Sequence, residues 1–298
     1  MAEMKVHGSV RVRVGRTATV GWVAAASALV GSGCVTTVTD DPYEEPVAAE
    51  NAALKNGTTF NGSGMSRGAV GIYFWAPLWN EWHTCSGQIV SKRTIMTAAH
   101  CVEGATAASN PGTAQIIVWR PSSTSSHVPV LTQTTVTGHF NPRYTETNYA
   151  TPFDIGVFVS PVDLQNVTSS DAGALAKSAP SNVTMYAFGF GYYNDGPLFY
   201  DDVGRSGAIT PTYATKGAEY FFSATSSQPQ ICKQDSGGPL KSTTSGPLLV
   251  YGVASRHSGS GTYCRPVGHW AAVTNSVSWL KTKITGSCLE TSTLYSCW

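Results

Sequence analysis

The sequence predicts a mainly β protein, and two observations support this fold class. Apolar residues occur in short runs that Gly or Pro interrupts, and Gly, Ser, Thr, Val and Tyr are frequent. Both features are typical of strands joined by turns. The chain has 298 residues, 42% hydrophobic and 12% charged, which suffices for one large or two small packed units. A formal net charge of +1 creates no field that would attract nucleic acid, so we expect no nucleic-acid partner.

The first 33 residues have the pattern of a signal peptide. Four basic residues precede an uncharged stretch, 17–33, that is rich in Ala and Val. They are Lys5, Arg11, Arg13 and Arg16. The stretch is too short to favour a permanent transmembrane helix, and no later run reaches the roughly 20 apolar residues that span a bilayer. We therefore expect an exported protein, either secreted or held in the cell envelope.

Cys34 stands directly after this leader and makes the cysteine count odd, at seven. In bacterial lipoproteins a cysteine at this place is acylated after cleavage and anchors the protein in a membrane. Two readings stay open, because Gly31 occupies the position where such proteins usually have Leu, and Ala26-Ser27-Ala28 offers an ordinary cleavage site. Cys34 is either lipidated, or it is removed with the leader or left free just after it.

Residues 34–53 form an acidic segment without a basic residue, which indicates a solvated linker or a short pro-segment. After it, short apolar segments predict strands. They include 71–75, 115–119, 183–188 and 248–253, and turn-rich connections are expected at 106–111, 121–126 and 192–197. Residues 275–284 lack Gly and Pro and space Val277, Leu280 and Ile284 for one face of a helix.

Three segments carry residues that together suit nucleophilic catalysis: 91–101 ends in His100-Cys101, 151–158 contains Asp154, and 232–239 contains Ser236. A Ser hydroxyl needs a base within hydrogen-bond reach, and His has the pKa for that task. A buried carboxylate then holds the imidazole and stabilises its cation. Asp154 fits because its apolar neighbours would make an unpaired charge costly. Taken singly, each residue has a structural alternative: a packed core His, a capping Asp, a Ser in a tight turn.

Together the segments closely resemble the motifs of the chymotrypsin-like (trypsin superfamily) serine peptidases, of a bacterial secreted or lipoprotein type. The match lies in Thr97-Ala98-Ala99-His100-Cys101, in Asp154-Ile155-Gly156 and in Asp235-Ser236-Gly237-Gly238-Pro239, in this order. The resemblance implies an all-β fold of two packed antiparallel six-stranded β-barrels with a C-terminal helix. His100 and Asp154 would come from the first barrel and Ser236 from the second, with an extended peptide in the cleft between them.

The resemblance also implies an activity and a domain organisation. We expect a serine endopeptidase that hydrolyses polypeptides through an acyl-enzyme with a Ser-His-Asp triad. It should be a monomer without cofactor or metal. The peptidase domain is expected at 54–286 and a C-terminal disulfide tail at 287–298, after a signal peptide at 1–33 and a linker at 34–53.

The expected oxyanion hole departs from the family pattern. Its donors in relatives are the backbone N–H groups of the serine and of the residue two before it, which is typically Gly and is Gln234 here. The Cβ of Gln restricts the backbone, and a misdirected donor would cost about 10²–10³ in turnover. This favours a rival hypothesis, in which the protease fold is retained as a weakly active or inactive binding module.

Asp235 is expected to take part in activation. In relatives a carboxylate at this place pairs with a new N-terminal amine that proteolysis releases. The nearest suitable start is Leu54-Lys55-Asn56-Gly57. We therefore expect a zymogen that is cleaved after Ala53.

The resemblance places the substrate pocket at Gln230, the base, at the wall Ser255-Arg256-His257, and at Gly268 on the opposite wall. Without a base Asp, trypsin-like specificity is disfavoured. His257 should narrow the entrance, while Gly268 should leave space. Arg256 and His257 would accept a small, polar or acidic side chain, or Arg256 points to solvent.

Without Cys34, six cysteines suit three bridges in an oxidising compartment, and the count alone leaves fifteen connectivities open. The resemblance selects Cys85 with Cys101 and Cys232 with Cys264, which leaves Cys288 with Cys297. A metal site is disfavoured, because no Cys-x-x-Cys occurs.

Overall fold

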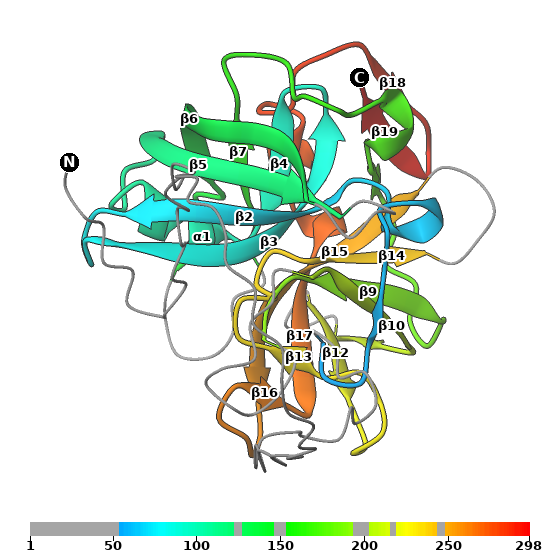
Figure 1. The fold of residues 1–298 in the computed structure, drawn as a ribbon. Helices are drawn as coiled ribbons and strands as arrows, with labels where there is room; N and C mark the ends of the chain where they lie inside the picture. Colours follow the sequence, from blue (N-terminus) through cyan, green and yellow to red (C-terminus); the bar gives the residue numbers. More distant parts are fainter. Residues whose placement is uncertain (1–53, 122–126, 146–152, 193–202, 215–218, 243–247) are drawn as a thin grey trace, which may run out of the picture. The chain divides into compact units, whose positions relative to one another are not determined.

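Short strands joined by turns build the fold, as the sequence predicts. The computed structural model describes residues 54–121, 127–145, 153–192, 203–214, 219–242 and 248–298. All of them belong to one compact unit, 51–298. The mainly β fold class is confirmed (Figure 1).

The first half of the described chain closes into a six-stranded antiparallel barrel in the order β2-β3-β4-β7-β6-β5. Its strands are β2 (Ala69–Ala76), β3 (Glu81–Ser91), β4 (Thr94–Thr97), β5 (Gly112–Arg120), β6 (Val128–Phe140) and β7 (Gly156–Val159). In β5 the residues Ala114, Ile116 and Val118 are buried at every second position. This alternation turns one face of the strand toward the barrel core.

The second half forms an eleven-stranded sheet in the described residues, with the main order β1-β10-β9-β14-β15-β17-β12-β11. These strands are β1 (Thr58–Thr59), β9 (Met185–Gly189), β10 (Arg205–Ile209), β11 (Thr212–Ala214), β12 (Glu219–Ser223), β14 (Pro239–Ser242), β15 (Leu249–Ser258) and β17 (Val267–Ala272). β8 (Ala174–Ala176) joins β15, and the hairpin of β18 (Cys288–Glu290) and β19 (Leu294–Cys297) adds to β8. A separate pair consists of β13 (Ile231–Cys232) and β16 (Cys264–Arg265).

The helices are short. The predicted C-terminal helix occurs as α2 (Val277–Leu280), preceded by the 3₁₀ turn η3 (Val273–Asn275). It is shorter than 275–284 because the hydrogen bond from Lys283 N to Leu280 O tightens the chain into a turn after Leu280. Two further 3₁₀ turns are η1 (Gly64–Ser66) and η2 (Ser169–Asp171). Helix α1 (Ala99–Ala105) was not predicted, because its seven residues are too few to display a helical period.

Lys241 of β14 joins the second half to the chain that enters the first barrel. Its side chain is fully buried and donates to the carbonyls of Arg67, at 2.7 Å, and Met65, at 3.2 Å. Its Nζ also lies 4.6 Å from the centroid of the Phe188 ring. Burial lowers the pKa of Lys241 well below its ordinary value, so these two carbonyls hold a group that is costly to bury.

Disulfides link Cys85 to Cys101, Cys232 to Cys264 and Cys288 to Cys297. This is the pairing that the resemblance implies. Within the described ranges, no helix has the length and apolar character that crossing a membrane requires.

We predict that Gly68→Ala destabilises the fold more than Gly64→Ala does. Both glycines have positive φ, at +69° and +54°, so each alanine incurs about 1–2 kcal/mol of backbone strain. A Cβ on Gly68 would lie 1.9 Å from the Asp171 carbonyl oxygen, whereas a Cβ on Gly64 has nothing within 4 Å. Urea unfolding should show about 2 kcal/mol more loss for Gly68→Ala. Equal losses would contradict this packing.

Candidate active site

His100 and Asp154 meet because β4 and β7 are antiparallel neighbours. Thr97, the last residue of β4, pairs with Gly156, the first residue of β7. His100 follows Thr97 by three residues, in α1, and Asp154 precedes Gly156 by two. The strand register therefore brings both residues to the same end of the barrel.

Asp154 holds the His100 imidazole in one orientation. Its Oδ2 lies 2.8 Å from His100 Nδ1, and its Oδ1 accepts from the His100 backbone N–H at 3.0 Å. The Ser255 hydroxyl donates to Oδ2 at 2.7 Å. The contact between Asp154 Oδ2 and His100 Nδ1 places the imidazole proton on Nδ1, which makes Nε2 the acceptor nitrogen.

Asp154 is ionised although only 2% of its side chain is exposed. Burial alone would raise its pKa, but the charge of His100 and the hydrogen bonds from His100 and Ser255 outweigh it and lower the pKa. His100 itself has 35% of its side chain exposed. The pair thus has a fixed, buried anion behind a ring that solvent can reach.

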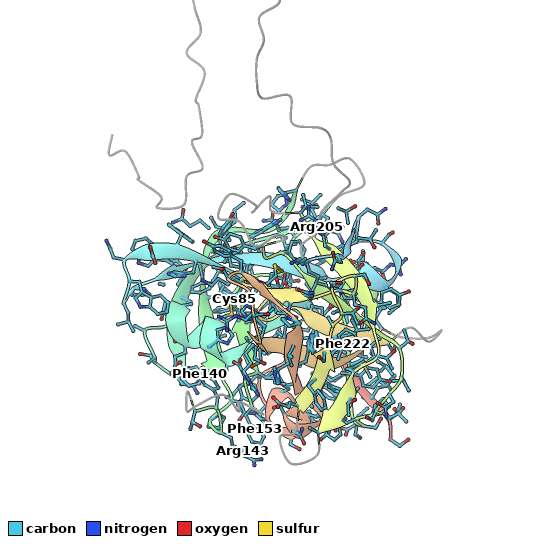
Figure 2. The ribbon with its side chains drawn as sticks, turned by 90° about the horizontal axis from the view of Figure 1, so that it is seen from below. Cys85, Phe140, Arg143, Phe153, Arg205 and Phe222 are labelled. Atoms are coloured by element: carbon cyan, nitrogen blue, oxygen red, sulfur yellow. A yellow bond between two sulfur atoms is a disulfide. The ribbon has the colours of Figure 1, made fainter. Side chains whose placement is uncertain are left out.

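The segment before β7 is held on both sides of Asp154. The guanidinium of Arg143 lies 3.7 Å from the centroid of the Phe153 ring (Figure 2). On the other side, Asn141 N donates to Ile155 O at 3.0 Å. These contacts fix the backbone at the carboxylate.

Ser236 lies in a turn between β13 and β14 that is anchored on the first barrel. Ser86 N, in β3, donates to Ser236 O at 2.7 Å. Gly237 has a φ of +88°, and a Cβ there would lie 2.1 Å from Ser86 O. The glycine after Ser236 is therefore required for this close approach.

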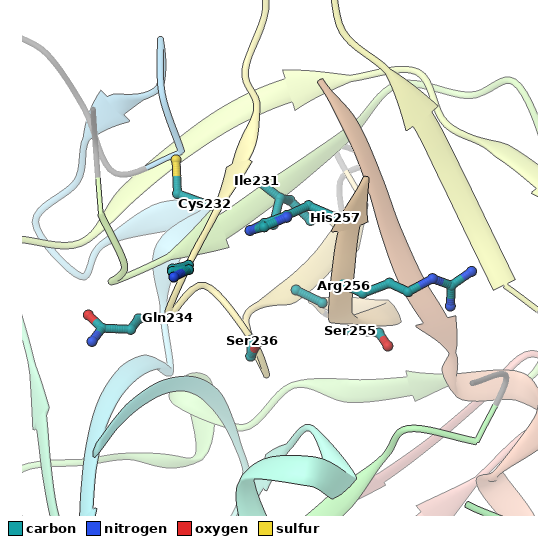
Figure 3. Close-up of a pocket in the computed structure, with 9 residues that line it drawn as sticks. Ile231, Cys232, Gln234, Ser236, Ser255, Arg256 and His257 are labelled. Carbon is teal, nitrogen blue, oxygen red and sulfur yellow. The ribbon is translucent and has the colours of Figure 1, made fainter. Parts of the chain in front are cut away.

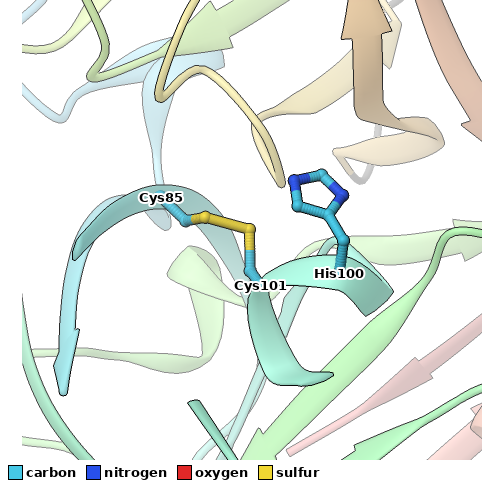
Figure 4. A group of neighbouring side chains, drawn as sticks. All are labelled: Cys85, His100 and Cys101. Atoms are coloured by element: carbon cyan, nitrogen blue, oxygen red, sulfur yellow. A yellow bond between two sulfur atoms is a disulfide. The ribbon is translucent and has the colours of Figure 1, made fainter. Parts of the chain in front are cut away.

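The Cys85–Cys101 disulfide lies close to both His100 and Ser236. Ring-nitrogen and sulfur atoms of His100, Cys85 and Cys101 lie within 4.8 Å of one another (Figure 4). Cys101 Sγ is also 3.9 Å from Ser236 O. Since both sulfurs are oxidised, the cluster offers no thiolate for a metal, and the disulfide instead ties α1 to β3 beside the Ser236 turn.

Two backbone N–H groups of this turn point at no acceptor. Five neighbouring N–H groups are bonded: those of Cys232, Lys233, Asp235, Gly237 and Gly238. Among the described residues, nothing accepts from the N–H of Gln234 or of Ser236. These two unpaired donors beside the Ser236 hydroxyl are therefore free to bind a ligand oxygen.

Gln234 keeps its donor by adopting a glycine-like conformation. Its φ is +73°, a left-handed value that costs a side chain about 1–2 kcal/mol. Tyr192 N donates to Lys233 O at 2.9 Å, and because the trans peptide points its N–H opposite to its C=O, Gln234 N–H faces the other way. Ser86 Oγ donates to Gln234 O at 3.1 Å. The Cβ of Gln234 thus strains the turn without misdirecting the donor.

Asp235 is fully buried and accepts hydrogen bonds from three backbone groups. The N–H groups of Cys232, at 2.8 Å, and Gly191, at 2.9 Å, donate to it, as does the backbone of Leu54. Burial raises its pKa to about 7, although these bonds and the charge of Arg205 act in the opposite direction. The structure thus brings Leu54 and Asp235 together.

A pocket of about 250 Å³ opens beside Ser236 (Figure 3). It is lined by Ile231, Cys232, Lys233, Gln234, Ser236, Ala254, Ser255, Arg256 and His257. Neither Gln230 nor Gly268 lines it. Gln230 is buried and donates to Thr225 O at 3.2 Å.

The space that we expected at Gly268 is not free. A Cβ there would lie 2.8 Å from the Trp270 ring and 3.0 Å from Ile231. These two side chains fill the opposite wall, which corrects the expectation.

Arg256 contributes no free charge to the pocket. Its guanidinium leads away from Ser236 (Figure 3) and contacts Glu219 at 3.1 Å and His269 Nδ1 at 3.3 Å. Burial would raise the pKa of Glu219, but His269 and Arg256 lower it. Arg256 therefore neither faces the substrate nor points freely to solvent, because Glu219 holds it.

Two functional contacts were not predicted from the sequence. Ser86 joins Phe190 N, at 2.9 Å, to Gln234 O and so supports the turn. Ser255 was expected to line the pocket, which it does, but it also donates to Asp154. No local pattern marks either serine, because both roles depend on a distant strand.

The fold and the site together define a chymotrypsin-like protease domain. Residues 62–280 match the trypsin family, and the chain belongs to that family. Its curated relatives include chymotrypsin-like elastase family member 1 of Macaca fascicularis, 24% identical over 226 residues, and of Bos taurus, 23% identical over 222. Each alignment covers 68% of this chain and 79% of the relative.

Solved structures share the fold. An inactivated protease paralogue of the scabies mite aligns with a TM-score of 0.53 and 17% identity, over 77% of this chain and 98% of that one. The protease Anisep from Arthrobacter nicotinovorans aligns with a TM-score of 0.50 and 18% identity, over 73% and 92%. At these identities the likeness concerns the fold alone.

We predict that Gln234→Gly stabilises the protein by about 1 kcal/mol, because glycine adopts a positive φ without strain. As a control, Gln165→Gly, at an exposed residue without positive φ, should be slightly destabilising. Urea unfolding of both variants measures the difference. Destabilisation by Gln234→Gly would mean that the turn is not strained as described.

Proposed function

We propose that this protein is a serine endopeptidase that hydrolyses polypeptides through an acyl-enzyme. The observation that carries the proposal is the joint arrangement of the His100–Asp154 pair and of the two unpaired N–H groups beside Ser236. Ser236 is the nucleophile, His100 the general base and Asp154 the carboxylate that orients it. Gln234 and Ser236 supply the oxyanion hole.

In this mechanism Ser236 Oγ attacks the scissile carbonyl carbon and its proton passes to His100 Nε2. Asp154 stabilises the imidazolium through the 2.8 Å contact with Nδ1. The carbonyl oxygen, now anionic, accepts from the N–H groups of Gln234 and Ser236, each worth about 10²–10³ in turnover. His100 then protonates the leaving amine, and water hydrolyses the ester by the same steps.

The rival function is a binding module with a degenerate site. Its main support was Gln234 in place of the usual Gly, because a misdirected oxyanion donor would lower turnover. The hydrogen bond from Tyr192 N to Lys233 O turns the Gln234 N–H away from Tyr192, and no described residue accepts from that N–H. This supports the enzyme over the binding module.

We predict that a fluorophosphonate probe labels Ser236 in the folded protein and does not label Ser236→Ala. The same variant should lose about 10⁶ in peptide turnover, because the nucleophile is removed. Intact mass and tandem mass spectrometry locate the label. An unlabelled Ser236 in processed, folded protein would support the binding module.

We also propose activation by cleavage after Ala53, which itself lies outside the described residues. The new amine of Leu54 would stand where its backbone N–H now contacts Asp235. An ammonium there would pair with the buried carboxylate and lower its pKa.

A pH-dependent stability follows for the uncleaved chain. The pKa of Asp235 is raised from 3.8 to about 7. Ionising this buried carboxylate is unfavourable. The free energy of unfolding is therefore highest below about pH 4, where Asp235 is protonated in both states, and it falls as the pH rises to about 7. Urea midpoints between pH 4 and 8 should show this fall, and both Asp235→Asn and cleavage after Ala53 should reduce it. An unchanged fall in Asp235→Asn would exclude Asp235 as its source.

The proposed location is secreted or in the cell envelope. Three disulfides fit an oxidising compartment. The signal peptide, the linker and the lipidation of Cys34 lie outside the described residues and stay predictions. The intact mass of the mature protein decides between a lipidated and a free or removed Cys34.

A further inference from the structure

The pocket beside Ser236 receives the side chain that precedes the scissile bond. A carbonyl carbon within reach of Ser236 Oγ must place its oxygen at the N–H groups of Gln234 and Ser236. Both residues line the pocket. The side chain one bond from that carbonyl therefore enters the space between residues 231–236 and the end of β15 (Figure 3).

Among the polar side chains that line this space, one is cationic and carries no ion pair with a described residue, and another can become cationic. Lys233 and His257 both line it. The Nδ1 atom of His257 is buried and has no hydrogen-bond partner among the described residues. A buried polar atom without a partner is costly, so a ligand that bonds it gains affinity.

The surrounding charges favour an anion. Burial lowers the pKa of His257, and the charges of Arg265, in β16, and of Lys233 lower it further. Interactions of the ring with the backbone of His257 and of Tyr263 raise the pKa, but they do not outweigh the other effects. Lys233 Nζ lies 5.1 Å from the centroid of the Tyr263 ring. A carboxylate would offset the repulsion among these groups and allow His257 to take up a proton.

Among the described residues that line the pocket, no acidic side chain competes for these cations. The residues that line the pocket include neither Asp nor Glu. Glu219 is engaged with Arg256 and His269. Asp235 is bonded by backbone N–H groups of Cys232 and Gly191.

We propose that His257 and Lys233 select a substrate with an acidic side chain, Glu or Asp, directly before the scissile bond. This inference rests on the proposed peptidase function. His257 Nδ1 donates to the carboxylate, and Lys233 adds attraction from the rim.

The test compares peptides that differ only in a Glu or a Gln before the scissile bond. The two side chains have nearly the same shape, so the ratio of their kcat/KM values reports the charge. We expect a ratio of at least about 10 in favour of Glu, as for a charge-assisted hydrogen bond. The ratio should fall from pH 5 to pH 8 as His257 loses its proton. The titration of His100 does not change the ratio, because it affects the cleavage of both peptides equally.

Variants assign the effect to residues. His257→Gln keeps a polar side chain that cannot be charged and should reduce the ratio to about 1–2. Lys233→Met should reduce it about two- to threefold, since an exposed charge is screened. The control His127→Gln alters an exposed histidine before β6 and should leave the ratio unchanged.

Labelling of Ser236 by the fluorophosphonate in each variant shows that the fold and the nucleophile are intact. A labelled protein with a ratio near 1, or a ratio that His257→Gln leaves unchanged, overturns the acidic preference and leaves the peptidase function standing. A protein that is neither labelled nor able to cleave either peptide overturns both.

Discussion

The rest of the site depends on how the turn at residues 232–238 is anchored. Its backbone donors bond partners that are distant in the sequence, among them the carbonyls of Ala254 and Tyr263. Ser86 of the first barrel also holds the turn, because its backbone N–H donates to Ser236 O. Because these contacts come from both halves of the fold, the two remaining donors face the pocket only when the halves are packed together. The geometry of this turn is thus a property of the packed domain.

Two buried carboxylates show how similar burial leads to different chemistry. Asp154 and Asp235 are both 2% exposed or less. Asp154 faces an imidazole and a hydroxyl, which lower its pKa. Asp235 faces backbone N–H groups, with Arg205 as the charge that acts on it, and burial prevails, so its pKa is raised to about 7. Asp154 is suited to stabilise an imidazolium on His100, and Asp235 is suited to pair with an additional cation.

Much of this arrangement could be predicted from local sequence, and the misses have physical causes. The residues 97–101 and 235–239 carry enough chemistry in a short span to indicate the family. The pocket was less predictable. Whether Gly268 leaves space depends on Trp270 and Ile231, and where Arg256 points depends on Glu219 of another strand. These are neighbours in space whose identity no spacing rule reports.

The sequence by itself determined the mainly β class and the family, because strand patterns and short motifs are local. Tertiary structure decided the rest. It showed that Gln234 adopts a φ of +73° beside Ser236, that the charge of Arg256 is paired with Glu219, and that His257, which lines the pocket, keeps an unpaired nitrogen. The physical reason is common to all three: the direction of a hydrogen-bond donor and the pairing of a charge are set by partners from distant strands.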